Sequence, residues 1–214
     1  MNEETGGIIA SPEVDEELSQ CGRYAYCWPR DAVFITQALD ILKMNKEADK
    51  FYSEFCRITQ SKNGMWEQRF YTDGKLAPCW GYQIDETASV VYGINEHYKK
   101  TKEMKFLKDT LKICESATKF LYIYMDNILG TRDESDIVKN EIEETYHTKG
   151  REKLPLSYDI WEMHEGVHLY SLASIYGAFN SMLEIYDNIK EQYTDNRLKL
   201  ENIHKNEIKI KKYI

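Results

Sequence analysis

Residues 156–186 read LSYDIWEMHEGVHLYSLASIYGAFNSMLEIY. The first part is polar and irregular, and it sets an acid, Glu162, directly after an indole, Trp161. The second part predicts a long amphipathic helix, because its apolar residues recur at helical spacing. Those residues are Val167, Tyr170, Ala173, Ile175, Tyr176, Phe179, Met182, Leu183 and Tyr186.

The same period recurs elsewhere, and only four prolines and eleven glycines interrupt it. It predicts an all-α protein whose further helices cover residues 31–42, 46–59, 85–100 and 104–125, with a sixth helix or frayed end after 195. Residues 65–82 and 130–155 are expected to be long loops, which a simple helical bundle would lack. In the second of these helices we expect Phe51, Phe55 and Ile58 to point inward. In the first, these residues follow at helical spacing: Val33, Phe34, Gln37, Ala38, Ile41 and Leu42.

The composition is that of a soluble globular chain, with 42% hydrophobic and 30% charged residues. The net charge of -8 argues against a nucleic-acid or anionic-membrane partner, since both require a basic face. The N-terminus lacks the features of a signal peptide, so we expect a cytoplasmic protein. Five cysteines without a C-x-x-C pair predict reduced, mostly buried thiols and no metal site of their own.

Glu162 is the first candidate for chemistry. A carboxyl group packed against an indole is partly desolvated, which favours the neutral form that a general acid needs. The alternative is a buried structural carboxylate that is hydrogen-bonded to the backbone.

A second alternative is zinc, because His164-Glu165-x-x-His168 is a metallopeptidase signature. It requires both histidines on one helical face and a third ligand, such as Glu184 or Glu191. Gly166 within that turn weakens the required helix.

Two further segments have groups suited to a sugar. Trp28 offers a stacking face, Arg30 a fork of donors and Asp31 two acceptors; the alternative is a helix-capping Asp31 paired with Arg30, beside a core tryptophan. Downstream, Trp80 and Gln83 are placed to flank a ligand while Asp85 accepts from a hydroxyl. Its alternative is that Asp85 and Glu86 only complement a helix dipole.

Taken together, residues 6–12, 24–32, 66–74, 83–88 and 158–168 resemble, in order and spacing, glycoside hydrolase family 15, the glucoamylase family. The resemblance covers residues 6–190, and the charged segment 191–214 follows it. It implies an (α/α)6 toroid of the six-hairpin glycosidase type. It also implies an inverting enzyme that releases sugar from the non-reducing end of an α-gluco-oligosaccharide, without a cofactor or metal.

Carried over by position, the resemblance makes Glu162 the general acid. It makes Arg30 and Asp31 the pair that holds the terminal glucose, and Trp28, Trp80 and Trp161 its aromatic walls. His168 becomes a family motif residue, which weakens the zinc alternative. Met163 stands where many relatives have a second acid, which affects contacts to the neighbouring sugar.

The resemblance does not include the segment that carries the catalytic base. Inversion requires a second carboxylate as base, about 6.5–9.5 Å from the acid, and no segment resembles the block that carries it. Residues 1–214 are therefore expected to form one partial catalytic domain, about the first half of the toroid. Its exposed apolar face would be covered by a complementary half or by self-association. A non-catalytic carbohydrate-binding fragment is the competing interpretation.

Overall fold

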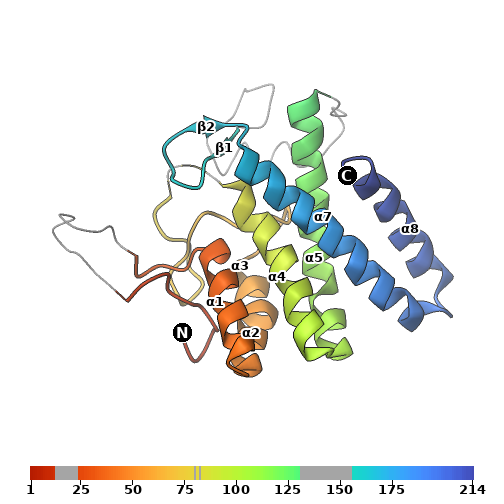
Figure 1. Ribbon diagram of the computed structural model, residues 1–214, viewed down its shortest axis with the longest axis horizontal. Coiled ribbons are helices and arrows are strands. Elements are labelled where there is room, and N and C mark those ends of the chain that lie inside the picture. Colours follow the sequence, from red (N-terminus) through yellow and green to blue (C-terminus); the bar gives the residue numbers. More distant parts are fainter. Residues whose placement is uncertain (13–23, 80, 82, 131–155) are drawn as a thin grey trace.

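The structure, a computed structural model, describes residues 1–12, 24–79, 81, 83–130 and 156–214. It confirms the all-α class (Figure 1). The helices are α1 (Pro29–Ile41), α2 (Asn45–Lys50), the π-helix η1 (Phe51–Phe55), α3 (Cys56–Thr59), α4 (Ile84–Thr101), α5 (Met104–Leu129), α7 (Leu169–Lys190), the 3-10 turn η2 (Glu191–Tyr193) and α8 (Arg197–Lys211). A two-residue antiparallel pair, β1 (Ser157–Tyr158) and β2 (Glu165–Gly166), precedes α7.

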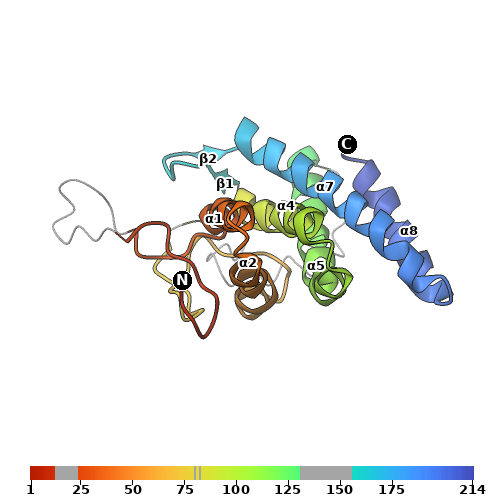
Figure 2. The same ribbon diagram turned by 60° about the horizontal axis from the view of Figure 1, so that its bottom comes forward.

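The helices form two layers. Helices α1, α4 and α7 lie side by side in one layer, with α4 in the middle and packed on both neighbours. Figure 2 shows α2 and α5 beneath them, and α8 lies against α7 and α5. Because α1, α4 and α7 start at the same end, the loops before them converge there. In the described part of the chain, no helix is both long and apolar enough to cross a bilayer.

Helix α1 begins earlier than its sequence predicts. Asp31 was expected as the N-cap, but the helix starts at Pro29 and Asp31 lies in its first turn. Proline suits the first helical position because its missing N–H has no partner there in any case and its φ is already helical. Trp28 is the N-cap residue and supplies no capping side chain.

The buried face of α1 does not follow its apolar spacing. Phe34 is 57% exposed, Ile41 is 73% exposed, and Leu42 is exposed too. Ile58 on α3, which was expected to point inward, is also exposed. The buried face of α1 carries polar residues instead, including Thr36 and Asp40. Each has a partner across the interface: Thr36 Oγ1 lies 2.6 Å from Tyr52 Oη, and Asp40 binds His97. Hydrophobicity alone misplaces this face because buried polar groups are tolerated when they are hydrogen-bonded.

The core between the layers is aromatic. Trp66 is fully buried, its indole N–H donates to Cys56 O at 2.9 Å, and its backbone N–H donates to Thr87 Oγ1 at 2.9 Å. The irregular segment before α4 is thereby fixed to both η1–α3 and α4. Cys27, Cys56 and Cys114 are buried as expected, and burial raises the pKa of each thiol. Cys79 is partly buried, and Cys21 lies outside the described residues.

A buried histidine joins helices α1, α2 and α4. His97 on α4 bonds Asp40 on α1 through Nδ1, at 2.7 Å, and Asp49 on α2 through Nε2, at 3.1 Å. Burial favours the neutral ring, but the hydrogen bonds to Asp49 and Asp40 outweigh it and raise the pKa of His97. The raised pKa favours the protonated ring, which links two carboxylates as a cation.

We expect the stability of the chain to depend on this proton. The contribution of His97 is complete below its unfolded pKa of about 6.5 and is lost as pH rises through the raised folded pKa. His97→Asn should cost about 3 kcal/mol near pH 6, because Asp40 stays buried without its cation. Urea unfolding from pH 5.5 to 8.5 measures this, with exposed His204→Asn as the control. A loss that did not shrink as the pH rose would contradict the cationic assignment.

The close contact between α1 and α4 depends on a glycine. A Cβ built at Gly93 would meet the hydroxyl of Tyr52 and lie 2.8 Å from Val33 Cγ1. Gly93→Ala should therefore destabilise the chain by about 2 kcal/mol, as overpacking outweighs the gain in helix propensity. Gly177→Ala on α7 is the matched control, since its nearest contact would lie 4.0 Å away; it should stabilise by about 0.5–1 kcal/mol. Equal effects in urea unfolding would refute the tight-packing argument.

Candidate active site

The first turns of α1 and α4 meet at a buried guanidinium. Arg30 Nη1 lies 2.8 Å from Asp85 Oδ2 and 3.1 Å from Glu86 Oε1, and Nη2 lies 3.1 Å from Asp31 Oδ2. The Arg30 side chain is 8% exposed and those of Asp85 and Glu86 are fully buried, whereas Asp31 is 41% exposed. Asp31 is therefore the member of this cluster that faces solvent.

The cluster keeps Arg30 charged. Burial alone would lower the pKa of Arg30, but Glu86, Asp85 and Asp31 together raise it above its usual value. Of these groups, sequence reasoning assigned Glu86 only a dipole role. Glu86 Oε2 also accepts from the backbone N–H of Arg30 at 2.6 Å, across 56 residues. Local sequence patterns could not reveal this role, because Glu86 on α4 contacts Arg30 on a different helix.

Gln83 connects this corner to the next loop. It is the N-cap residue of α4, is fully buried, and donates from Nε2 to Asp159 O at 2.7 Å. Ser157 Oγ accepts from the backbone N–H of Ile84 at 3.0 Å beside it. The loop before α7 is therefore attached directly to the start of α4. Trp80, the other predicted residue of this segment, lies outside the described residues.

Asp159 organises the turn between β1 and β2. Its Oδ1 accepts from the backbone N–H groups of Met163 at 2.7 Å and His164 at 2.8 Å, and its carbonyl accepts from Glu162 N at 2.9 Å. These hydrogen bonds, with that of His164 foremost, lower the pKa of Asp159. They hold Glu162 at φ +61°, a left-handed conformation that non-glycine residues rarely adopt.

Glu162 meets an indole, but not that of its sequence neighbour. Trp28 Nε1 donates to Glu162 Oε1 at 3.2 Å, across 134 residues. Trp161, expected to shield the acid, is 79% exposed. Trp28 is itself held by Tyr24 and Tyr26, and the guanidinium of Arg69 lies 5.3 Å above its ring.

The structure therefore brings most of the predicted residues to one end of the α1–α4–α7 layer. Trp28 links the group, because it contacts Glu162 and directly precedes the first turn of α1, which carries Arg30 and Asp31. Asp85 and Gln83 stand at the start of α4 behind them. The assembly combines a carboxylic acid, aromatic faces, a donor fork and exposed acceptors, which are the groups that sugar chemistry uses.

The zinc alternative does not fit the geometry. His164 precedes β2, His168 follows it in an extended conformation, and α7 begins only at Leu169, so the two histidines are not one helical turn apart. His168 Nε2 bonds the backbone oxygen of His164 at 2.9 Å. Among the described residues, no cluster of three or more His, Cys, Asp or Glu is arranged to hold a metal ion.

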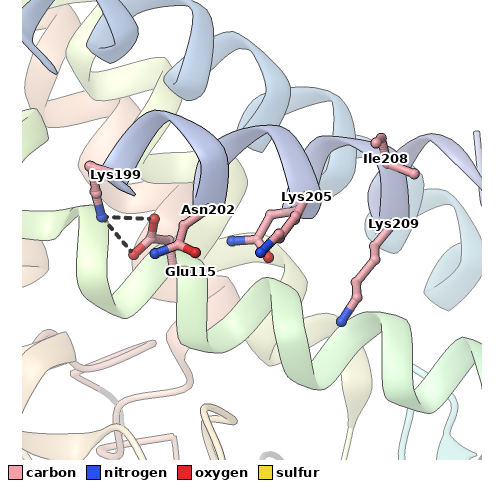
Figure 3. Close-up of a pocket in the computed structure, with 7 residues that line it drawn as sticks. Glu115, Lys199, Asn202, Lys205, Ile208 and Lys209 are labelled. Carbon is pink, nitrogen blue, oxygen red and sulfur yellow. Dashed lines mark hydrogen bonds and ion pairs between the residues drawn. The ribbon is translucent and has the colours of Figure 1, made fainter. Parts of the chain in front are cut away.

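A cavity of about 550 Å³ lies elsewhere, between α5 and α8 (Figure 3). Glu115, Lys199, Asn202, Lys205, Asn206, Ile208 and Lys209 line it. Glu115 pairs with Lys199 at 3.1 Å across the gap. This cavity shares no residue with the Glu162–Trp28–Arg30 group, and its carboxylate, Glu115, is paired with Lys199.

Comparison with known proteins identifies the family of the chain. The model of Glycosyl hydrolases family 15 matches residues 1–209. An uncharacterized glycosyl hydrolase, MJ1610 of Methanocaldococcus jannaschii, is 26% identical over 173 residues, which are 81% of this chain and 23% of that protein.

Solved structures show the same fold. A wild-type glycosidase superposes with a TM-score of 0.58 at 17% identity, over 84% of this chain and 44% of that one. Its E335A variant in complex with glucose superposes with a TM-score of 0.57 over the same shares. These likenesses confirm the expected partial all-α toroid. The chain spans under half of the solved glycosidases and about a quarter of the curated relative.

We expect Asp159 to be required for the ordered turn around Glu162. Asp159→Ala removes the acceptor of two backbone N–H groups, so the amides of Met163 and His164 should exchange faster with deuterium. In the wild-type chain their protection should be complete above pH 4 and fall as pH drops through the lowered pKa of Asp159. Hydrogen-exchange mass spectrometry of residues 158–168 measures both, with exposed Asp187→Ala as control. Unchanged exchange in the Ala variant would contradict this role.

Proposed function

The chain belongs to the glycosyl hydrolases of family 15, and from this premise we propose a glucoamylase-type activity. The proposed reaction is the inverting hydrolysis of terminal α-glucosidic bonds in gluco-oligosaccharides. The observation that carries the proposal is the hydrogen bond from Trp28 Nε1 to Glu162 Oε1. It joins the candidate acid to the start of α1, where Arg30 and Asp31 stand.

In this proposal Glu162 donates a proton to the glycosidic oxygen as the bond to the leaving sugar breaks. A positioned general acid contributes about 10²–10⁴-fold to such a rate. The turn built by Asp159 fixes the carboxyl group, and the Trp28 N–H fixes one of its oxygens. The other carboxyl oxygen of Glu162 is assigned to contact the glycosidic oxygen of the substrate.

The terminal glucose is assigned to the Arg30 cluster. Asp31 is the exposed acceptor of that cluster and binds sugar hydroxyls, while Arg30 orients it and adds donors. Asp85 supports Arg30 from behind, and Gln83 ties this support to the acid loop. Trp28, Trp80 and Trp161 are assigned to the aromatic walls, Trp161 as a solvent-facing side chain.

The reaction also needs a base, which we assign to a further helical segment. Inversion places a second carboxylate about 6.5–9.5 Å from the acid, and no motif of these 214 residues resembles the block that carries it. The layer of α1, α4 and α7 exposes apolar side chains for such a partner: Phe34, Ile41, Tyr92, Leu169 and Tyr176. The partner is a complementary half of the toroid or a second copy of this chain.

Glu162→Gln tests the catalytic assignment. The amide keeps the shape of the side chain but cannot donate the proton, so kcat on maltose should fall about 10²–10⁴-fold while binding changes little. Glucose release from maltose, maltotriose and trehalose should be measured for the chain alone and with its complementary polypeptide. Calorimetry with maltose measures binding separately.

The matched control is Glu165→Gln, in the same loop, where Glu165 Oε1 accepts from the backbone N–H of Leu156. Equal loss of activity in both variants would refute Glu162 as the acid. The second candidate function is sugar binding without turnover, which the coverage of under half of the solved glycosidases favours for the isolated chain. Maltose binding with no glucose release under any pairing would support that candidate.

A further inference from the structure

Glu86 links α1 and α4 through both of its oxygens. Oε2 accepts from the backbone N–H of Arg30 at 2.6 Å, and Oε1 contacts Arg30 Nη1 at 3.1 Å. Helix α1 has no capping side chain of its own, because its N-cap residue is Trp28. Glu86 thus satisfies a free N–H in the first turn of α1 from the neighbouring helix, and it holds the side chain of the same residue.

The charges around Glu86 do not balance if every acid is ionised. Asp31 on α1 and Asp85 on α4 share the Arg30 guanidinium with it, giving three carboxylates to one cation. Among the described residues, Tyr170 on α7 and Cys27 before α1 are further titratable groups that face this corner, and neither adds a positive charge. Two fully buried carboxylates beside one cation leave a net buried negative charge, which is costly in a medium of low polarity.

The hydrogen bonds show the same deficit. Within the described part of the chain, Glu86 Oε1 and Asp85 Oδ1 are buried oxygens that receive no hydrogen bond, although Oε1 makes its ionic contact with Arg30. Two ionised carboxylates are acceptors only and cannot satisfy each other. A proton on Glu86 would make this carboxyl group a hydrogen-bond donor. The corner needs a donor, because Asp85 Oδ1 is a buried acceptor without a hydrogen bond.

We propose that Glu86 is a positioning residue for Arg30 and performs this role as a neutral carboxylic acid, while Asp85 stays ionised beside it. The sugar-binding part of this inference rests on the proposed function, because Arg30 is there assigned to the terminal glucose. The proton itself does not depend on it.

The electrostatic surroundings of Glu86 favour the same protonation state as the geometry. Burial raises the pKa of Glu86 well above its ordinary value; the Arg30 guanidinium offsets only part of this, and Asp85 and Asp31 add to it. With Glu86 neutral, Arg30 is balanced by Asp85 and Asp31, and its position is fixed before a ligand arrives. Such preorganisation spares the ligand the cost of ordering the site.

The first experiment locates the proton without a sugar. Carbon-13 NMR should show the Glu86 carboxyl in its neutral form at pH 7, with the signal assigned by its loss in Glu86→Gln. In urea, the unfolding constant of the wild-type chain should rise by up to about tenfold more per pH unit above pH 5 than that of Glu86→Gln, because the folded chain keeps a proton that the unfolded chain loses. An ionised Glu86 signal at pH 7, or parallel pH dependence of the two chains, would overturn the proposal.

The matched control is Glu96→Gln, a carboxylate on the same helix that pairs with Lys99 at 2.9 Å away from this corner. It should follow the wild-type pH dependence. If it instead behaved like Glu86→Gln, the effect would reflect any lost carboxylate on α4, and the assignment to Glu86 would fall.

The second experiment tests positioning. Glu86→Ala should weaken maltose binding by about tenfold and speed exchange of the Arg30 side-chain N–H protons, since a charged hydrogen-bonded group loses its support. Glu86→Gln should rescue affinity to within about threefold of wild type, which a purely structural loss of charge would not predict. Equal affinity in all three chains would refute positioning. If the wild-type chain bound no maltose, the proposed function would fail, while Arg30 exchange and the NMR signal would still decide the role and protonation of Glu86.

Discussion

One buried guanidinium sets the arrangement of the functional end. A charge as deeply placed as Arg30 must be paired, and its partners Asp85 and Glu86 are both on α4. Their contacts with Arg30 fix the first turn of α4 against that of α1 and leave Asp31 turned to solvent. The polar inner face of α1 follows the same logic further along, where Asp40 meets the cationic ring of His97. Helices α1 and α4 are thus joined by paired charges as well as by the close approach at Gly93.

The acid loop is placed from this frame rather than by its own residues. Gln83 at the start of α4 holds the carbonyl of Asp159, Asp159 shapes the turn, and the turn presents Glu162 to Trp28 at the start of α1. The connections form a closed circuit from α1 to α4, to the loop and back to α1. A circuit of this kind restrains the Glu162 carboxyl more tightly than a single contact would, because each link limits the motion of the next.

The two-layer arrangement corresponds to part of the fold of the solved glycosidases. Helices α1, α4 and α7 pack side by side, and α2 and α5 lie against one face of this layer (Figure 2). The helices of this layer carry exposed apolar side chains, among them Phe34, Tyr176 and Leu169. The solved glycosidases continue well beyond the matched region, which makes up 44% of the wild-type glycosidase chain. The partner that we propose as the source of the base would also bury these exposed apolar side chains.

The sequence by itself determined the helices and the chemistry of the loops. The long periodic segments that became α4, α5 and α7 were predictable because repeated apolar spacing outweighs local exceptions, and Gly166 correctly argued against a helix at the two histidines. The sequence did not determine which face of α1 is buried, which indole meets Glu162, or that Glu86 has more than a dipole role. Those outcomes depend on pairs 134 and 56 residues apart. Only the tertiary structure decides them, because the stability of a buried polar group depends on partners that packing brings to it.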